Sequence, residues 1–188
     1  MIDRRSVLAG ASALLCAPSI VTANPAPANR LPRRFRMREV DVNPALPAGV
    51  LIVKQSEFHL YWTLGDGRAL RYGIALGAEG RNFFGDAVIA RKAEWPSWRP
   101  TQNMIRLEPN LYGPYRDGLP GGHPMNPMGS AALYMYVNGR DTFYRVHGTP
   151  FPQMIGQGWS SGCVKLRNDD MDDLYRRVPV GTRISIQV

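Results

Sequence analysis

The run SSGCVKLRN at residues 160–168 and the run HGT at residues 147–149 decide how this sequence folds and what chemistry it offers. Cys163 follows His147 by 16 residues. A thiol becomes a nucleophile when a nearby base accepts its proton, and histidine suits this role because its pKa is near neutrality. Gly162 allows a tight turn that aims backbone N–H groups at a developing oxyanion. The two runs therefore predict a Cys–His nucleophilic site.

Cys163 has other interpretations that the residues alone leave open. A free cysteine is among the most buried residue types and also serves as a small, inert hydrophobe. Zinc is disfavoured, because structural zinc sites use four ligands and Cys16, the other cysteine, lies in an export signal. We expect no metal and no cofactor. If Cys163 is the nucleophile, we expect it to carry more thiolate than a free thiol, with the Ser160 and Ser161 hydroxyls holding the loop or contributing to the site.

Residues 1–23 have the pattern of an export signal. Arg4 and Arg5 precede an apolar stretch, residues 7–20, which is too short to span a membrane. The paired arginines favour the twin-arginine route over the general secretory route. Cleavage is expected after Ala23, which predicts an exported, periplasmic protein without a transmembrane span.

The rest of the chain has about 165 residues, the length of one domain. Its formal net charge is +7, against +8 for the whole chain. This basic charge suits an anionic surrounding such as a cell wall or membrane surface, or it serves solubility alone. The export signal argues against a nucleic-acid partner. Residues 24–47 are rich in proline and arginine and are expected to be an extended linker, which leaves residues 48–188 as the folded domain.

The folded domain is expected to be mainly β. Its short apolar runs are separated by turn residues, as in hairpins. Asn138-Gly139 is a strong hairpin-turn signal, and it places His147 at the end of the returning strand. The predicted strands are residues 50–54, 58–63, 69–76, 86–92, 131–137, 142–147 and 182–188.

Two short helices and one long loop complete the expected elements. Residues 101–106 form the first helix. Residues 168–178 form the second, with an apolar face at helical spacing and Asn168 as its N-cap. Residues 108–130 contain five prolines and read as a long loop. Loops of this length commonly cover a functional site.

Three further side chains are candidates of lower rank. Trp159 directly precedes the SSGCVKLRN run and is expected to line the pocket. His59 alternates with apolar neighbours on a predicted strand and is expected to face solvent. His123 lies in the long loop, where an exposed position is favoured over contact with a substrate.

The same residues resemble the signature of the L,D-transpeptidase catalytic domain, the YkuD-type domain. That signature joins a histidine and Gly-Thr to Ser/Thr-x-Gly-Cys, a branched apolar residue, a basic residue and an asparagine. The resemblance extends over residues 48–188, and it implies a β-sandwich with one or two short helices and a long loop over the site. It is carried further by DVNPALPAGVLIVKQSEFHLYW (41–62), YGIALGAEG (72–80), NPMGSAALYM (126–135) and LYRRVPVGTRISI (174–186).

The resemblance implies a role for each matching residue. Cys163 is expected to be the nucleophile and His147 the base that later returns the proton. Gly148 is expected to position His147 through its carbonyl, and Gly162 to supply the oxyanion hole together with Cys163. The residues expected to bind substrate are Ser160, Ser161, Lys165, Arg167 and Trp159.

Members of the family act on peptidoglycan stem peptides. They attack a tetrapeptide after the L-centre of its diamino acid, release D-Ala, hold the remainder as a thioester and transfer it to an amine. The resemblance therefore implies a 3→3 cross-link, or attachment of an outer-membrane protein or lipoprotein acceptor. Two alternatives stay open: an L,D-carboxypeptidase that uses the same residues, and a noncatalytic domain that binds the cell wall.

The sequence departs from the family pattern at three positions. Ser161 and Lys165 stand where many members have histidine and arginine, and Pro150 stands where they have asparagine. Arginine grips a carboxylate with two parallel hydrogen bonds and lysine does not. We therefore expect substrate contacts here to differ from those of other members.

Overall fold

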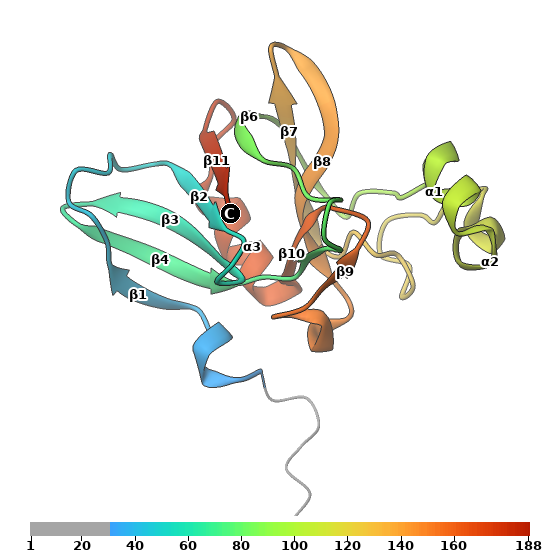
Figure 1. The fold of residues 1–188 in the computed structure, drawn as a ribbon, viewed down its shortest axis with the longest axis horizontal. Coiled ribbons are helices and arrows are strands. Elements are labelled where there is room, and N and C mark those ends of the chain that lie inside the picture. The colour runs from blue at the N-terminus through green and yellow to red at the C-terminus, as the bar shows by residue number, and fades with distance from the viewer. Residues whose placement is uncertain (1–30) are drawn as a thin grey trace, which may run out of the picture.

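Strands form most of the regular structure between residues 31 and 188, the part of the chain that the computed structural model describes (Figure 1). The side chains of Trp159 and Ser160 are not described, and the expected export signal, residues 1–23, lies outside the described residues. The mainly β fold predicted from the sequence is confirmed. The strands are β1 (Arg38–Asp41), β2 (Leu51–Lys54), β3 (His59–Gly65), β4 (Arg68–Gly73), β5 (Leu76–Gly77), β6 (Gly85–Glu94), β7 (Ala131–Val137), β8 (Arg140–Thr149), β9 (Gly158–Ser160), β10 (Val164–Arg167) and β11 (Arg183–Gln187).

Short helices connect some of these strands. The predicted helix at 101–106 is α1 (Gln102–Leu107), and the Thr101 hydroxyl caps it by accepting a hydrogen bond from the Met104 N–H at 3.2 Å. The expected long loop after it contains α2 (Pro109–Tyr112) and a 3₁₀ turn, η2 (Gly113–Tyr115). The C-terminal helix is α3 (Asn168–Arg177), and two further 3₁₀ turns are η1 (Arg33–Phe35) and η3 (Pro152–Met154).

One mixed sheet organises the described residues. It has nine strands in the order β1–β4–β3–β2–β11–β6–β7–β8–β10, and β5 pairs with β9 separately. Most neighbours are antiparallel, but β11 runs parallel to β2 and β10 runs parallel to β8. The β7–β8 hairpin turns at Asn138 and Gly139, whose φ angles are +50° and +73°. Positive φ at both positions is what a tight hairpin turn requires, so this turn is confirmed.

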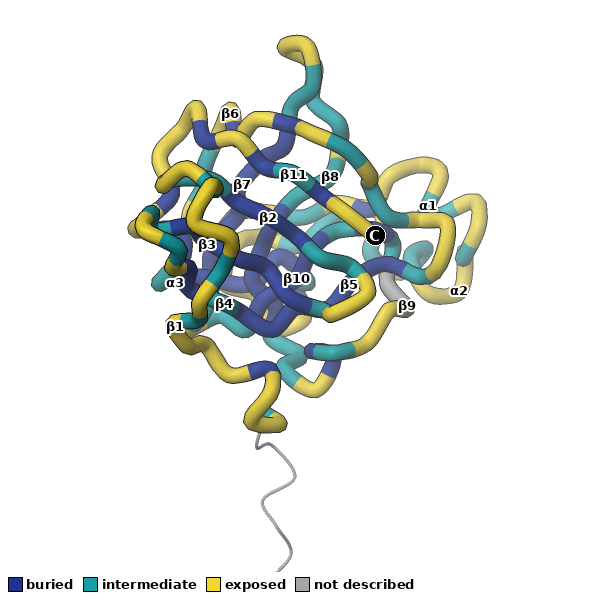
Figure 2. Tube along the Cα trace, turned by 60° about the vertical axis from the view of Figure 1, so that its left-hand side comes forward, coloured by how far each residue is buried: buried dark blue, intermediate teal, exposed yellow. Residues whose placement is uncertain are grey.

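The core packs side chains from both ends of this sheet against α3. Side chains of β2, β3 and β4 lie in one buried cluster with those of β6, β7, β8, β10 and β11. Met171 and Leu174 of α3 complete the cluster and are fully buried. Figure 2 shows the buried segments running through the centre of the molecule. Val146 and Val164 point into this core, so the residues beside them on β8 and β10 face the opposite side of the sheet.

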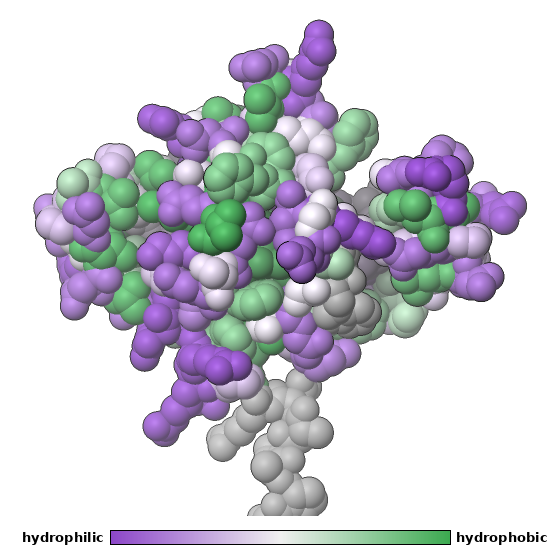
Figure 3. Space-filling model, viewed as in Figure 1, coloured by the Kyte–Doolittle hydropathy of each residue, from purple (hydrophilic) through white to green (hydrophobic). Residues whose placement is uncertain are grey.

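The surface is mixed in character. On the face drawn in Figure 3, hydrophilic side chains are interspersed with hydrophobic ones. None of the helices within residues 31–188 combines the length and the hydrophobicity that crossing a membrane requires.

Part of the expected linker belongs to the fold. The prediction that residues 24–47 are an extended linker is wrong for residues 33–41, because β1 pairs with β4 along its whole length. Phe35 is only 4% exposed, and a side chain at Gly73 or Gly156 would collide with it. We call residues 33–41 the N-terminal arm. His59 was expected to face solvent but is buried under this arm, and its Nε2 hydrogen-bonds to the Arg34 carbonyl at 2.9 Å. The arm covers one edge of the sheet.

Replacing Phe35 with alanine is therefore expected to lower the free energy of unfolding by about 3 kcal/mol, the usual cost of deleting a buried phenylalanine. Urea unfolding monitored by circular dichroism would measure this change. Met37→Ala is the matched control, because Met37 lies in the same arm but is 41% exposed; its effect should stay within about 0.5 kcal/mol. Equal, small effects at both positions would show that the arm contributes nothing to the core.

Candidate active site

His147 and Cys163 come together because β8 and β10 are parallel neighbours. The register sets His147 opposite Lys165 and Val146 opposite Val164. Cys163 directly precedes Val164, so it lies one step earlier, beside Arg145. Residues two apart on a strand share a face. His147, Arg145, Cys163 and Lys165 therefore form a group of four on the face of the sheet that is turned away from the core.

A cavity of about 610 Å³ opens over this group. Both His147 and Cys163 line it, together with Ser161 and Lys165. The register continues from His147 to Ala132 on β7 and from there to Ala93 on β6. Ala93 lines the cavity with only a methyl group, whereas Ala132 is buried in a cluster with Met128 and Tyr134.

The segment between β6 and β7 forms the wall of the cavity. Its contributions include Trp98, Met104, Tyr112 and Met128. The expectation of a long loop over the site is thus confirmed, with α2 inside residues 108–130 and α1 directly before them. The Asn126 side chain braces the loop, since its Nδ2 donates to the carbonyls of Pro96 and Pro120, each at 2.9 Å.

His147 is held as a neutral imidazole. It is 2% exposed, and its Nδ1–H donates to the Gly148 carbonyl at 2.6 Å. Burial, followed by the nearby positive charge of Lys165, lowers the pKa of His147 to about 3, although the Gly148 carbonyl opposes this shift. A proton on Nδ1 of a neutral imidazole leaves Nε2 as the acceptor. The imidazole is therefore unprotonated and able to accept a proton throughout the neutral range.

Cys163 is held as a thiol. Burial raises its pKa above that of a free thiol, and a backbone hydrogen bond at Arg145 and the charges of Lys165 and Arg145 offset this only in part. The expectation of enhanced thiolate character is therefore wrong. A buried anion is costly, and the uncharged imidazole beside Cys163 provides no cation to offset that cost. The resting pair is a thiol and a neutral imidazole.

This arrangement predicts how alkylation of Cys163 depends on pH. A raised pKa means less thiolate at any given pH, so the alkylation rate by a neutral reagent should still be rising between pH 7 and pH 9. Intact-mass measurement of iodoacetamide labelling at several pH values, with free cysteine as the reference, would record the profile. A rate that is constant from pH 5 to pH 8 would instead indicate a thiolate–imidazolium pair and contradict the geometry described.

Gly162 occupies a position that only glycine fills without strain. Its φ is +125°, and a Cβ there would collide with the Arg81 carbonyl oxygen and approach the Tyr144 ring. The tight turn before Cys163 is thus present as the sequence predicted.

Asn168 plays a part that the sequence did not reveal. The N-cap of α3 is Arg167, without a side-chain capping bond, so the prediction of Asn168 as the N-cap is wrong. Instead, Asn168 Oδ1 accepts a hydrogen bond from the Ser130 N–H at 3.1 Å and packs where a side chain on Gly148 would lie. Asn168 thereby fixes the backbone whose carbonyl holds the His147 ring.

The remaining predicted substrate-binding residues are divided between two places. Ser161 lines the cavity and hydrogen-bonds to the Tyr112 side chain. Lys165 also lines it, is 8% exposed, and has its pKa lowered by burial. Arg167 lies elsewhere: it pairs with Asp169 at 2.8 Å and lines a separate cavity with Arg34 of the N-terminal arm.

The side chains of Trp159 and Ser160 are not described, so their expected roles stay predictions. In the part of the chain that is described, no three His, Cys, Asp or Glu side chains are grouped so that they could hold a metal ion.

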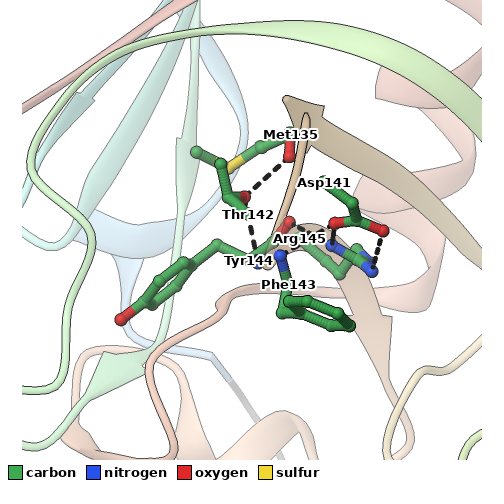
Figure 4. A network of polar contacts seen from close by, with 6 residues as sticks. All are labelled: Met135, Asp141, Thr142, Phe143, Tyr144 and Arg145. Carbon is green, nitrogen blue, oxygen red and sulfur yellow. Dashed lines mark hydrogen bonds and ion pairs between the residues drawn. The ribbon is translucent and has the colours of Figure 1, made fainter. Parts of the chain in front are cut away.

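Arg145 is a site residue that the sequence analysis missed. Its guanidinium grips both Asp141 carboxylate oxygens, with Nη1–Oδ1 at 2.7 Å and Nη2–Oδ2 at 2.9 Å (Figure 4). Its Cζ also lies 4.4 Å from the centroid of the Tyr134 ring. The sequence did contain a signal for it. Arg145 lies two residues before His147 on the same strand, and side chains at that spacing point to the same face of the sheet.

The strand before Arg145 is bulged. The β7–β8 register shifts between Tyr134 and Tyr136, and the Thr142 hydroxyl donates to the Met135 carbonyl at 2.6 Å (Figure 4). Phe143 has a φ of +62° and is 73% exposed at the cavity rim.

Comparison with known proteins identifies the family. The chain matches the L,D-transpeptidase catalytic domain model (YkuD) over residues 48–186, and it belongs to that family. The probable L,D-transpeptidase ErfK/SrfK of Escherichia coli K12 is 34% identical over 177 residues, covering 89% of this chain and 54% of the relative. The probable L,D-transpeptidase YbiS of the same organism is 33% identical over 172 residues, covering 88% and 54%. The chain spans about half the length of these curated relatives.

Solved structures share the fold. An L,D-transpeptidase from Enterococcus faecium has a TM-score of 0.55 at 16% identity, covering 77% of this chain and 52% of that one. A crystal structure from Brucella melitensis, described as a probable carnitine operon oxidoreductase, has a TM-score of 0.56 at 41% identity, covering 80% and 92%. That description names a different activity, so the family assignment rests on the family model and the Escherichia coli proteins.

Proposed function

We propose that the protein is a cysteine acyltransferase that acts on peptidoglycan stem peptides as an L,D-transpeptidase. The observation that carries this proposal is that one cavity is lined both by Cys163, which directly precedes β10, and by a neutral, buried His147 on the parallel neighbour β8. The family to which the chain belongs supports the same reaction class.

The acylation step follows from the two protonation states. As Cys163 Sγ bonds to the carbonyl carbon of the donor peptide, its proton passes to Nε2 of His147. The carbonyl oxygen becomes an oxyanion, and the backbone N–H groups at Gly162 and Cys163 are the donors proposed to stabilise it. The C–N bond then breaks, His147 returns the proton to the departing D-Ala amine, and a thioester remains on Cys163.

Deacylation reverses the roles of the same groups. An amine acceptor attacks the thioester carbonyl while His147 accepts a proton from the amine nitrogen. When the C–S bond breaks, the proton returns to Cys163 Sγ and restores the resting pair. The acceptor is a second stem peptide, giving a 3→3 cross-link, or an amine of an outer-membrane protein or lipoprotein.

Substrate binding is assigned to the residues around the reacting pair. Lys165 presents a single ammonium rather than a planar fork, so it suits one oxygen of a donor carboxylate. Ser161 offers a hydroxyl at the same wall. We also propose roles for Ser160, Trp159 and Arg167, the last from the separate cavity that it lines with Arg34.

Location follows from the N-terminal segment. We propose that residues 1–23 are a twin-arginine export signal and that the protein acts in the periplasm, where peptidoglycan is accessible. N-terminal sequencing of the periplasmic protein would place the cleavage site.

Product analysis tests the proposed function and its main alternative. The purified protein would be incubated with a tetrapeptide donor and an amine acceptor, and the products analysed by mass spectrometry. A cross-linked product with release of D-Ala supports transfer, whereas a free tripeptide alone indicates an L,D-carboxypeptidase. If no D-Ala is released while the protein still binds sacculi, the noncatalytic wall-binding alternative holds.

A further inference from the structure

A row of four side chains crosses the sheet at the level of Cys163. The register sets Arg91 on β6 opposite Tyr134 on β7, and Tyr134 opposite Arg145 on β8. Cys163 lies beside Arg145, one residue before β10 begins. All four residues line the same cavity. The row therefore runs along the cavity floor from the nucleophile to Arg91.

Tyr134 orders the two arginines of this row. The Arg91 Cζ lies 3.3 Å from the centroid of the Tyr134 ring, and the Arg145 Cζ lies 4.4 Å from it. Guanidinium stacking on an aromatic face restricts the side chain without using its N–H donors, which lie in the guanidinium plane. Arg91 is thus oriented while its donors stay available.

The two arginines differ in what neutralises their charge. Arg145 is paired with Asp141. Among residues 31–188, no carboxylate forms an ion pair with Arg91, and no acidic side chain lines the cavity. The lining includes four cationic side chains, namely Arg91, Arg99, Arg145 and Lys165. Arg91 is therefore oriented by Tyr134 but has no acidic partner among the described residues, and it lies at the far end of a positive cavity.

We infer that Arg91, stacked on Tyr134, forms a subsite for a carboxylate of the substrate peptide at a distance from the bond that Cys163 attacks. Three strand spacings separate Arg91 from Cys163, which is about 14 Å. An extended peptide covers that distance in about four residues. The inference rests on the proposed function, and it adds a specificity-determining residue outside the SSGCVKLRN run.

Peptide binding to Cys163→Ala protein tests the subsite without catalysis. The probes are donor and acceptor stem peptides in which each carboxylate in turn is converted to an amide, and binding is measured by calorimetry. Amidation of one particular carboxylate should weaken binding about tenfold, as expected for one charge-assisted hydrogen bond. When Arg91→Gln is added, the same amidation should have no further effect, because coupled partners are not additive.

Arg183→Gln is the matched control, because Arg183 is an exposed arginine of the neighbouring strand β11 that does not line the cavity. It should leave the amidation effect unchanged. The subsite does not exist if Arg91→Gln weakens binding no more than Arg183→Gln does. It also does not exist if each amidation weakens binding to the Arg91→Gln protein as much as it weakens binding to the protein that retains Arg91. Absence of D-Ala release by the wild-type protein would refute the proposed function instead. The binding result with the Cys163→Ala protein would remain valid in that case.

Discussion

Replacing Cys163 with alanine is expected to lower the rate of acyl transfer at least about a thousandfold. Alanine has no atom that can bond to the donor carbonyl, so no thioester forms and the covalent route is lost. Release of D-Ala from a tetrapeptide donor, quantified in a coupled assay, measures the rate. The substitution should leave the fold intact, because Cys163 lies on the cavity face of the sheet and not in the core cluster.

Cys163→Ser sharpens this test. It retains a hydroxyl of similar size, but its higher pKa makes it a much weaker nucleophile beside the same imidazole. We expect it to be nearly as inactive as the alanine variant, with an unchanged urea midpoint. Substantial activity in either variant would place the nucleophile elsewhere, and Ser161, which lines the same cavity, would be examined next.

Replacing His147 with glutamine is expected to lower kcat by about a hundredfold to ten thousandfold, the range that a general acid–base residue contributes. Glutamine cannot accept the Cys163 proton or return one to the leaving amine. Because the pKa of His147 lies at about 3, loss of activity in the wild type between pH 7 and pH 5 is not expected from protonation of this residue. Rates across that pH range measure both effects.

His123→Gln is the control for this substitution. His123 is exposed in the loop between α2 and β7 and does not line the cavity. Its replacement should leave kcat and the pH profile unchanged. Equal activity of the His123 and His147 variants would exclude His147 as the base.

Local signals in the sequence were sufficient to predict many elements of the fold. The Asn138-Gly139 turn, the helix after Thr101 and the glycine before Cys163 each depend on the conformational preference of one or two residues, and each is present in the structure. The pairing of β8 with β10 is different, because it joins strands that are separated by η3 and β9. Composition and periodicity do not specify such a pairing, and residues 164–167 were not among the predicted strands.

The predictions that failed involve tertiary environment. Phe35 and His59 were misassigned because neither proline-rich composition nor alternation shows that an arm folds back over a sheet edge. Asn168 is a residue type that often caps helices, but its Oδ1 accepts a hydrogen bond from the Ser130 N–H instead of from a helix N–H. The thiol state of Cys163 depends on burial and on the charge of its neighbours, neither of which a motif specifies.

Intact-mass analysis of the protein mixed with a tetrapeptide donor, in the absence of an acceptor, tests the proposed chemistry most directly. Formation of the thioester predicts a mass gain equal to the donor minus D-Ala, located on the peptide that contains Cys163 and absent from the Cys163→Ala and Cys163→Ser proteins. Release of D-Ala by the wild type with the adduct on another residue, or an adduct of equal yield in the Cys163→Ala protein, would contradict Cys163 as the acyl carrier.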